Sequence, residues 1–325
     1  MKVFITGGLG FIGTYLSKAL ADKGANVVVY DNFTNYINPD QSNYYHMLSW
    51  RLKHIDKKVE ILRGDVRVQK SLIRAVRKFE PDVIINLAAL AIAQKTREFA
   101  DEATTINVHG TLNALESLRE LKKVKKFIFF SSSFVYGNFK RKYVVETDSL
   151  GPIDIYGGTK LTGEIFTETY CRELGFPYVI IRPSAVYGYG DANNRVSYKL
   201  IENAFLKKPL IVHDENTRLD FTYIEDIVQG TLKCIYSPKA NNQIFNITYG
   251  EACTIKEYIN ILKEYFPKIK VKKQKSDILR PKRGTLDISK AKKLLGYQPQ
   301  YPLERGLREY LKGVKEYGLN VDSIK

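Results

Sequence analysis

A tyrosine and a lysine stand four residues apart in the stretch DIYGGTK, residues 154–160. Residues with this spacing lie on one face of a helix, so Tyr156 and Lys160 would project to the same side. A tyrosine that accepts a proton near neutral pH needs its pKa lowered by about three units from ~10, which corresponds to ~4 kcal/mol. One positive charge ~4 Å away supplies this free energy at an effective dielectric constant near 20, so Lys160 is the candidate charge. An ordinary surface pair on an amphipathic helix has the same spacing.

Two glycines separate this pair, although each should weaken a helix by ~1 kcal/mol relative to alanine. Asp154 is a candidate N-cap, which would place Gly157 and Gly158 in the first turn of the helix, where the penalty is milder. We expect that neighbouring backbone and bound groups pass close to this turn, which leaves room for small residues only.

A second set of glycines lies near the start of the chain. The stretch TGGLGFIG places Gly7, Gly10 and Gly13 between a β-branched run and a helical pattern. Glycines there allow a tight turn and let a pyrophosphate approach the helix N-terminus. Such a triplet can be a simple turn, but the strand–turn–helix context favours a dinucleotide site. Asp31 ends the next strand, 18 residues after Gly13. A carboxylate there accepts both ribose hydroxyls and repels a 2′-phosphate, which predicts NAD rather than NADP unless Asp31 is only a turn residue.

Apolar runs typical of buried strands alternate with helical patterns over residues 1–188. This alternation predicts an α/β fold, a Rossmann-like doubly wound parallel sheet with helices on both faces. The pattern becomes irregular afterwards, so we expect an NAD-binding domain over 1–188, joined by part of 225–250, and a smaller mixed C-terminal substrate-binding lobe over 189–325. The segment 33–57 is longer than a usual β–α connection and could be a surface insertion or a flap.

Composition narrows the class of protein. The 325 residues are 44% hydrophobic and 26% charged, as in soluble globular proteins. No apolar run reaches the ~18 residues of a membrane span, and the N-terminus enters a strand pattern without a signal peptide. Three scattered cysteines lack metal-binding spacing, which favours reduced thiols, a cytoplasmic location and no metal. The net charge of +16 is dispersed, so it indicates a solvated face or attraction of small polyanions rather than nucleic-acid binding.

The stretches TGGLGFIG, SSSFVYG, YGGTK, RPSAVYG and DFTYIEDI resemble, in order and spacing, the extended short-chain dehydrogenase/reductase family. Within it the chain is most similar to the NAD-dependent nucleotide-sugar epimerase/dehydratase branch, over nearly its whole length. The resemblance implies that Tyr156 is the base, that Lys160 holds the nicotinamide ribose and lowers the tyrosine pKa, and that Ser132 shares the proton of the sugar hydroxyl. It also implies a homodimer that pairs the helices around 97–121 and 155–174.

The remaining site residues are expected as follows. Arg218 and Arg280 would bind the substrate pyrophosphate through their forked guanidinium groups, unless they are solvated surface residues, and Ser133 would also contact substrate. The residues expected to bind the cofactor are Gly7, Gly10, Phe11, Ile12, Gly13, Asp31, Asn32, Asp65, Val66, Leu87, Ala88, Ala89, Asn107, Tyr156 and Lys160.

The expected activity is epimerisation. Dehydratases of this branch resemble one another in carrying Asp-Glu directly after the catalytic Ser or Thr, whereas Ser133 and Phe134 supply neither acid nor base here. We therefore expect an NAD-dependent 4-epimerase of UDP-hexoses or UDP-uronates that forms a transient 4-keto sugar. A 4-ketoreductase or 2-epimerase of CDP-, GDP- or dTDP-linked deoxysugars stays open, as does a non-enzymatic NAD-binding protein with a basic nucleic-acid-associated surface.

Three departures from the family pattern bear on the substrate. Ala185 stands where the family usually has asparagine, Leu219 replaces an arginine, and RPKRG (280–284) replaces RPGD and so lacks its aspartate. Together they suggest a substrate other than ordinary UDP-galactose.

Overall fold

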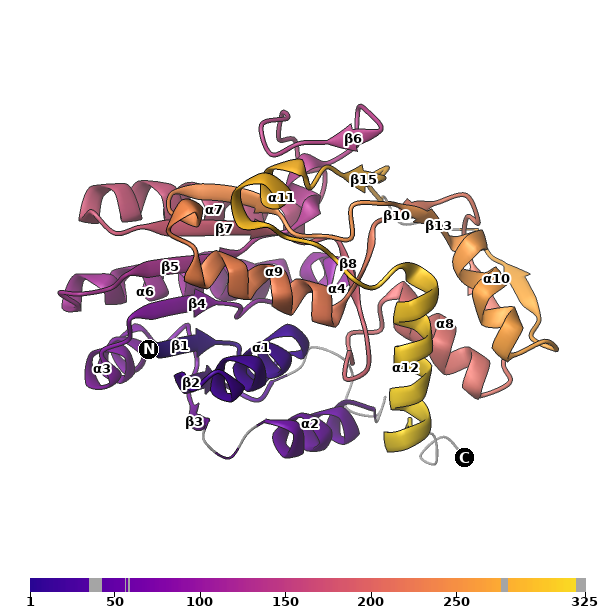
Figure 1. The fold of residues 1–325 in the computed structure, drawn as a ribbon, viewed down its shortest axis with the longest axis horizontal. Helices are drawn as coiled ribbons and strands as arrows, with labels where there is room; N and C mark the ends of the chain where they lie inside the picture. Colours follow the sequence, from indigo (N-terminus) through magenta and orange to yellow (C-terminus); the bar gives the residue numbers. More distant parts are fainter. Residues whose placement is uncertain (35–42, 56, 58, 276–279, 320–325) are drawn as a thin grey trace.

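The computed structural model describes residues 1–34, 43–55, 57, 59–275 and 280–319. At its centre is a seven-stranded sheet in which every neighbouring pair of strands is parallel (Figure 1). The strands in spatial order are β12 (Gln243–Asn246), β7 (Tyr178–Arg182), β5 (Lys126–Phe130), β4 (Val83–Asn86), β1 (Lys2–Thr6), β2 (Asn26–Asp31) and β3 (Glu60–Arg63). The order reverses between β1 and β4, and ligands of such sheets bind at the carboxyl ends of the strands beside this point.

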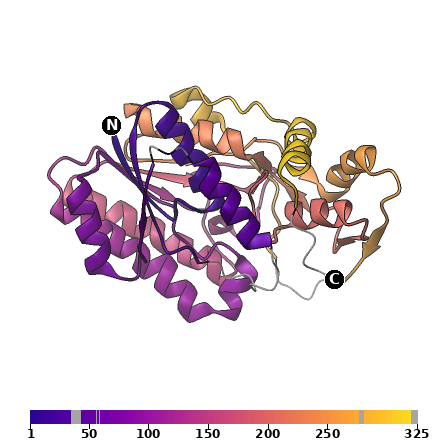
Figure 2. The same cartoon turned by 90° about the horizontal axis from the view of Figure 1, so that it is seen from below.

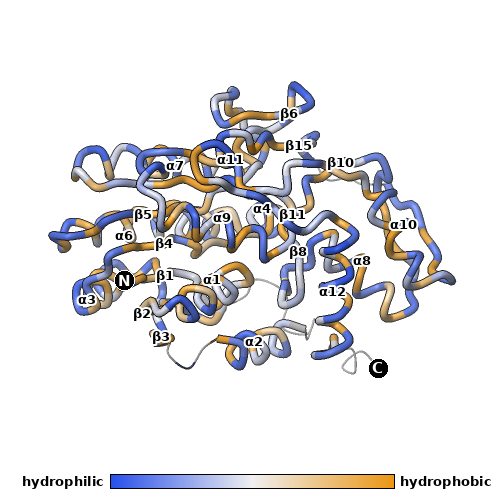
Figure 3. The backbone as a smooth tube through the Cα atoms, viewed as in Figure 1, coloured by the Kyte–Doolittle hydropathy of each residue, from blue (hydrophilic) through white to orange (hydrophobic). Residues whose placement is uncertain are grey.

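Helices cover both faces of the sheet (Figure 2), which confirms the doubly wound prediction. On one face, α3 (Gln69–Phe79), α6 (Gly110–Glu116) and α7 (Ile155–Leu174) bury residues such as Leu72, Leu115 and Cys171. On the other, α1 (Phe11–Asp22), α9 (Ile224–Tyr236) and α11 (Ser289–Leu295) bury Leu16 and Ile227 among others. In Figure 3 apolar residues concentrate in the strands between these layers. Strands β4, β5 and β7 are buried at every residue because both of their faces are covered, whereas the edge strand β3 is only partly buried.

The region around 97–121, which the sequence predicts as helical, is divided into five pieces. They are α4 (Ala93–Glu98), α5 (Ala100–Thr104), a π-helical turn η1 (Thr105–His109), α6 and a 3₁₀ turn η2 (Ser117–Glu120). A π turn accommodates one extra residue in a helix and often marks a functional site. Here it carries Asn107, one of the expected cofactor-binding residues.

The apolar stretch YVIIRPSAVYG, residues 178–188, is typical of one strand, but the structure divides it. Pro183 has no N–H to donate, and the chain leaves the sheet there. Strand β7 ends at Arg182, and β8 (Ala185–Tyr187) pairs instead with β11 (Phe221–Tyr223). This exit leads the chain from the main sheet into the smaller lobe.

The smaller lobe combines short strand pairs with three helices. Helices α8 (Val196–Phe205), α10 (Ile255–Tyr265) and α12 (Leu303–Tyr317) surround the pairs β9 (Leu210–Val212) with β14 (Val271–Lys273) and β10 (Arg218–Leu219) with β13 (Cys253–Thr254). Strand β15 (Thr285–Leu286) returns to pair with β6 (Tyr143–Val144), and η3 (Ser133–Tyr136) and η4 (Pro238–Ala240) are 3₁₀ turns. Within the described ranges, no helix is both long and apolar enough to cross a membrane.

Part of the insertion 33–57 forms helix α2 (Asn43–His54), whereas residues 35–42 and 56 lie outside the described ranges. Arg51 donates from Nε and Nη2 to the Gly190 carbonyl at 3.1 and 2.6 Å, and from Nη1 to the Leu9 carbonyl at 3.1 Å. Trp50 packs edge-on against Tyr189 with ring centroids 5.0 Å apart. Helix α2 therefore joins the glycine-rich loop to the chain that follows β8.

Candidate active site

The serine run at the end of β5 forms a tight turn beside the sheet edge. Ser132 caps the 3₁₀ turn η3, and its Oγ accepts the backbone N–H of Phe134 at 3.3 Å. The preceding Ser131 donates its hydroxyl proton to Glu164 on α7. Glu164 in turn forms an ion pair of 2.6 Å with Arg182, and both side chains are almost fully buried. This buried pair ties the serine turn to α7 and β7, and the sequence analysis did not identify it.

Helix α7 begins as predicted, with Asp154 as its N-cap. The Asp154 Oδ1 accepts the backbone N–H of Gly157 at 2.7 Å. A Cβ on Gly157 would stand 2.8 Å from the Phe134 carbonyl oxygen, whereas one on Gly158 would meet nothing within 4 Å. Neighbouring backbone thus explains the first glycine, as expected, and leaves the second unexplained by packing.

Lys160 is buried and faces the end of β5. Its Nζ donates to the Phe130 carbonyl at 2.7 Å and lies 5.1 Å from the centroid of the Phe129 ring. Burial lowers the pKa of Lys160 to about 8. The Lys160 amine is therefore still mostly protonated at neutral pH, because its pKa lies about one unit above that pH.

The electrostatic surroundings of Tyr156 differ from the expected pattern. Burial raises the pKa of this phenol above its usual value, and the groups that lower it are Arg195, a hydrogen bond with Ser132, and Arg283. Lys160 is turned toward the Phe130 carbonyl. The cations that favour the phenolate in this structure are therefore arginines from the smaller lobe, which sequence spacing on one helix could not reveal.

A groove at the carboxyl ends of β1, β2 and β4 holds most of the expected cofactor residues. Gly7 adopts a left-handed conformation (φ +67°), and a Cβ there would stand 2.6 Å from the Ala88 nitrogen. Helix α1 begins after Gly10 with no side-chain cap and no acidic residue in its first turn, which suits a pyrophosphate. The lining includes Gly7, Gly10, Phe11, Ile12, Gly13, Asp31, Asn32, Asp65, Val66, Leu87, Ala88 and Ala89. These residues fit NAD.

Asp31 holds the glycine-rich loop from the end of β2. Its Oδ2 accepts the Leu9 N–H at 2.9 Å, and its Oδ1 accepts the Phe33 N–H at 2.8 Å. A carboxylate has about four acceptor sites, so each oxygen can still accept a ribose hydroxyl. Burial raises the pKa of Asp31.

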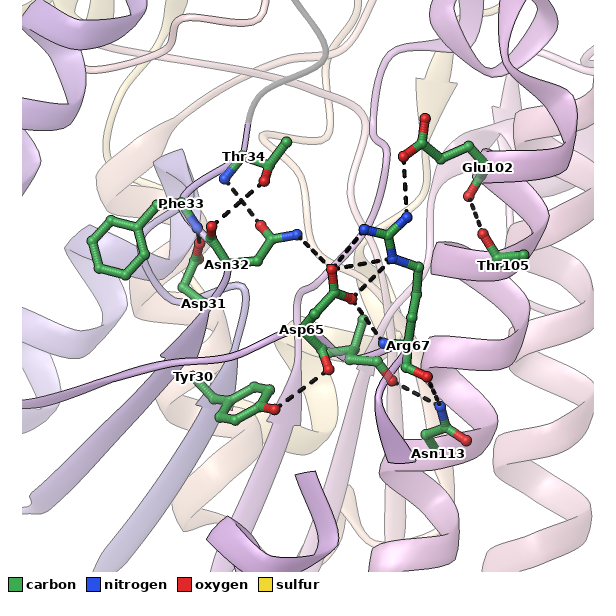
Figure 4. A network of polar contacts seen from close by, with 11 residues as sticks. Tyr30, Asp31, Asn32, Phe33, Thr34, Asp65, Arg67, Glu102, Thr105 and Asn113 are labelled. Carbon is green, nitrogen blue, oxygen red and sulfur yellow. Dashed lines mark hydrogen bonds and ion pairs between the residues drawn. The ribbon is translucent and has the colours of Figure 1, made fainter. Parts of the chain in front are cut away.

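Asp65 lies at the centre of the polar network in Figure 4. Asn32 Nδ2 donates to its Oδ2 at 3.1 Å, and Arg67 Nη2 donates to the same oxygen at 2.7 Å. Arg67 also reaches Glu102 on α5 at 3.1 Å. Burial acts to raise the pKa of Asp65, but the hydrogen bonds from Arg67 lower it overall. Asp65 therefore stays a carboxylate, the form that could accept an adenine amino group.

Asn107, expected to bind the cofactor, is not among the described residues that line this groove, but it hydrogen-bonds Leu90, which does line it. Its Oδ1 accepts the Leu90 N–H at 2.8 Å, and its Nδ2 donates to Thr159 Oγ1 at 3.0 Å. Leu90 lines the groove and Thr159 precedes Lys160 in α7. Asn107 thus positions the chain after β4 relative to the catalytic helix.

A larger cavity of about 1370 Å³ opens from the serine turn into the smaller lobe. Ser132, Tyr156 and Lys160 line it, which brings the three expected catalytic residues together. Of the expected substrate residues, Arg280 lines this cavity. The structure does not bring the other two there.

Ser133 and Arg218 point elsewhere for identifiable reasons. Ser133 is fully buried, and its backbone N–H donates to the Pro183 carbonyl at 2.8 Å. Arg218 donates from Nη2 to the Ala252 carbonyl across the β10–β13 pair. Neither residue is among those that line the cavity in the described part of the chain.

Two of the charged lining residues that the sequence did not predict, Arg195 and Arg283, also lower the pKa of Tyr156. Arg195 lies just before α8 and lines both the groove and the cavity, and no motif marks it. Arg283 lies within RPKRG, and its departure from the family pattern was the available signal.

Comparisons with known proteins agree with this geometry. The family model described as "NAD dependent epimerase/dehydratase family" matches residues 3–248. The Bacillus subtilis protein named uncharacterized UDP-glucose epimerase YtcB is 32% identical, over 94% of this chain and 96% of that protein. A crystal structure of UDP-glucuronic acid 4-epimerase from Bacillus cereus, with UDP-glucuronic acid and NAD, is 30% identical with a TM-score of 0.89, covering 97% of this chain and 99% of that one.

A second solved structure, UDP-glucose 4-epimerase from Thermotoga maritima with UDP-glucose, is 27% identical with a TM-score of 0.86, covering 97% of this chain and 99% of that one. The glycine loop with Asp31 and the group Ser132, Tyr156 and Lys160 both agree with the family that the model identifies. The chain belongs to the NAD dependent epimerase/dehydratase family, and NAD is its cofactor.

Proposed function

We propose that the chain is an NAD-dependent 4-epimerase of UDP-hexoses or UDP-uronates that acts through a transient 4-keto sugar. The observation that carries this proposal is the convergence of Ser132, Tyr156 and Lys160 on one cavity wall next to the dinucleotide groove. The similarity to the UDP-glucuronic acid and UDP-glucose 4-epimerases named above supports the same substrate class.

Tyr156, Ser132 and Lys160 each have a separate role in the proposed reaction. Tyr156 takes the proton of the C4 hydroxyl, and Ser132, which hydrogen-bonds the phenol, shares it. NAD, when bound, supplies a nicotinamide ring that accepts the C4 hydride and returns it. The ketone turns within the cavity, takes back the hydride on its other face, and recovers the proton from Tyr156. Lys160, held by the Phe130 carbonyl, orients the nicotinamide ribose.

The wall beside Tyr156 disfavours dehydration. Elimination of water needs an additional acid and base. At the position where a dehydratase would carry glutamate, Phe134 packs edge-on against the Tyr156 ring with centroids 5.4 Å apart. A phenyl ring can neither donate nor accept a proton, so this position supplies no acid or base for elimination.

The test is incubation of the purified protein with a panel of nucleotide sugars, with chromatography of the products and simultaneous measurement of cofactor absorbance. We expect the product to be a C4 epimer of a UDP-sugar, formed without accumulation of reduced cofactor. Loss of water from the sugar, stoichiometric NADH formation, or turnover of deoxysugars linked to other nucleotides would favour the alternative activities instead.

We also propose a homodimer in the cytoplasm, with NAD bound mainly by residues 1–188 and part of 225–250 and substrate mainly by 189–325. Exposed apolar side chains on and beside the α4 and α7 helices, Phe99, Ile155 and Ile165, support dimerisation through these helices. Pairing of β12 with β7 supports the return of the chain to the first domain. Light scattering of the purified protein, with Ile165→Glu as the disrupting variant, tests the dimer.

A further inference from the structure

The cavity wall carries more positive than negative side chains. Its lining carboxylates are Asp154, Glu202 and Asp214, whereas its lining cations are Arg97, Lys160, Arg195, Lys199, Lys275, Arg280 and Arg283. A UDP-sugar brings a diphosphate, so an excess of positive charge is expected where the diphosphate lies. The excess extends, however, to the end of the cavity where Tyr156 stands.

Arg283 belongs to RPKRG, which stands where the family usually has RPGD, and it replaces the aspartate of that motif. It lines the same cavity as Tyr156. Its guanidinium carbon lies 4.7 Å from the centroid of the Phe134 ring. The Phe134 ring lies edge-on against Tyr156, with 5.4 Å between centroids. Arg283, Phe134 and Tyr156 thus lie next to one another, in this order, along the wall of the cavity.

The guanidinium of Arg283 is partly buried and has no anionic partner among the described residues. Within the described residues it donates no hydrogen bond, and no carboxylate oxygen lies within 4.0 Å of it. Asp154, whose charge raises the pKa of Arg283, already accepts the Gly157 N–H at 2.7 Å. Burial lowers the pKa of Arg283 to about 10, so the group remains charged at neutral pH. A desolvated charge without a partner is costly, and a ligand anion would supply one.

Stacking on Phe134 also orients this charge. An aromatic face holds a guanidinium flat and leaves its N–H groups free to project from the edge. This edge matches the two oxygens of a carboxylate, which accept two parallel hydrogen bonds. The Arg283 guanidinium over the Phe134 ring is therefore a candidate fork for a carboxylate next to Tyr156.

We propose that Arg283 binds the C6 carboxylate of a UDP-uronate and makes the enzyme prefer uronates over neutral UDP-hexoses. The inference rests on the proposed function, because it assumes that the C4 hydroxyl lies against Tyr156. In that pose C5, which carries the carboxylate, is the ring neighbour of C4, whereas the diphosphate is attached to C1 across the ring. A cation at the Tyr156 end of the cavity is thus placed for the carboxylate, and Arg280 remains available to the diphosphate.

The experiment compares UDP-glucuronate with UDP-glucose in the NAD-loaded enzyme and in three variants. In the wild type, kcat/KM should be higher for UDP-glucuronate. Arg283→Met should lower the ratio of the two kcat/KM values by about 10- to 100-fold, the loss typical of a charged hydrogen bond. Arg283→Lys should retain part of the ratio. Lys282→Met removes a charge from the neighbouring exposed residue, which does not line the cavity, and should leave the ratio unchanged.

Calorimetric titration of each variant with UDP-glucuronate, UDP-glucose and UDP alone separates the possible failures. A wild type that epimerises UDP-glucose at least as efficiently as UDP-glucuronate would overturn the inference and leave the proposed function intact. Equal losses for both sugars with weaker binding of UDP would make Arg283 a diphosphate ligand and would also overturn it. If neither sugar is epimerised, the proposed function fails. The titrations then still decide whether Arg283 discriminates the carboxylate.

Discussion

The two adjacent glycines of helix α7 should respond in opposite ways to the same substitution. In an exposed or open position, Gly→Ala stabilises a helix by up to ~1 kcal/mol. Gly158 is such a position, because a Cβ there meets nothing within 4 Å. A Cβ on Gly157 would stand 2.8 Å from both the Phe134 carbonyl oxygen and the Pro152 Cβ, whereas ordinary contacts begin near 3.4 Å.

The difference between the two positions can be estimated from these distances. For Gly157→Ala the 3₁₀ turn or the start of α7 must move by about half an ångström, and overpacking of this kind costs ~1–3 kcal/mol. The turn carries Ser132 and contacts Tyr156 through Phe134, so its displacement also misplaces reacting groups, which can cost ~100-fold in rate for a shift of ~1 Å. We expect Gly157→Ala to lower turnover by about 10- to 100-fold and Gly158→Ala to leave it near the wild-type value.

Thermal unfolding, bound NAD and turnover of the two variants test this reasoning together. Gly158→Ala should raise the melting temperature by about 2 °C, and Gly157→Ala should lower it by a few degrees. Equal stability and equal turnover of the two variants would refute the packing argument. Loss of NAD from Gly158→Ala would instead show that a bound group needs the space above the second glycine.

Three further predictions concern single residues of the site. Tyr156→Phe should lower turnover by at least about 100-fold while the purified protein retains NAD, because only the proton acceptor is lost; turnover within a few fold of the wild type would contradict the assigned base. Burial lowers the pKa of Lys160 from 10.5 to about 8, so between these pH values the unfolded chain binds the proton more tightly than the folded protein does. The free energy of unfolding should therefore rise with pH in this range, by up to about 3 kcal/mol relative to the Lys160→Met variant. Urea unfolding at pH 7.5 and 9.5 measures this, and equal changes in both proteins would show that the buried lysine is not the cause. Asp31→Ala should weaken NAD binding by at least about tenfold and reduce discrimination against NADP, as measured by calorimetric titration; unchanged selectivity would leave Asp31 as a loop anchor only.

The sequence predicted the parts of the fold that rest on local pattern. The alternation of apolar runs and helical periods was enough for the parallel sheet with helices on both faces, and the cap at Asp154 was found where expected. The π turn around Asn107 and the break within the apolar stretch 178–188 after Arg182 were not predicted. The first depends on an inserted residue that leaves the apolar pattern intact, and the second could have been read from Pro183.

The site was predictable where residues close in sequence act together. The glycine loop, Asp31 and the Tyr156–Lys160 pair each lie within one motif, and their positions followed from it. The arginines that influence Tyr156 come from segments 39 and 127 residues further along the chain, so only the tertiary fold brings Arg195 and Arg283 there. Arg218 was predicted to contact substrate, and its neighbours Thr217 and Leu219 do line the cavity. Its own side chain instead donates to the Ala252 carbonyl, a contact that the sequence does not reveal.

In the proposed reaction, hydride leaves C4 of a UDP-sugar and returns to the same carbon within the cavity that Tyr156 lines. The most direct measurement is turnover of UDP-glucuronate and UDP-glucose labelled with deuterium at C4. The account predicts a C4-epimerised product that keeps its deuterium and a slower reaction than with the unlabelled sugar. Loss of the deuterium to water, or epimerisation at another carbon with the C4 label undisturbed, would contradict it.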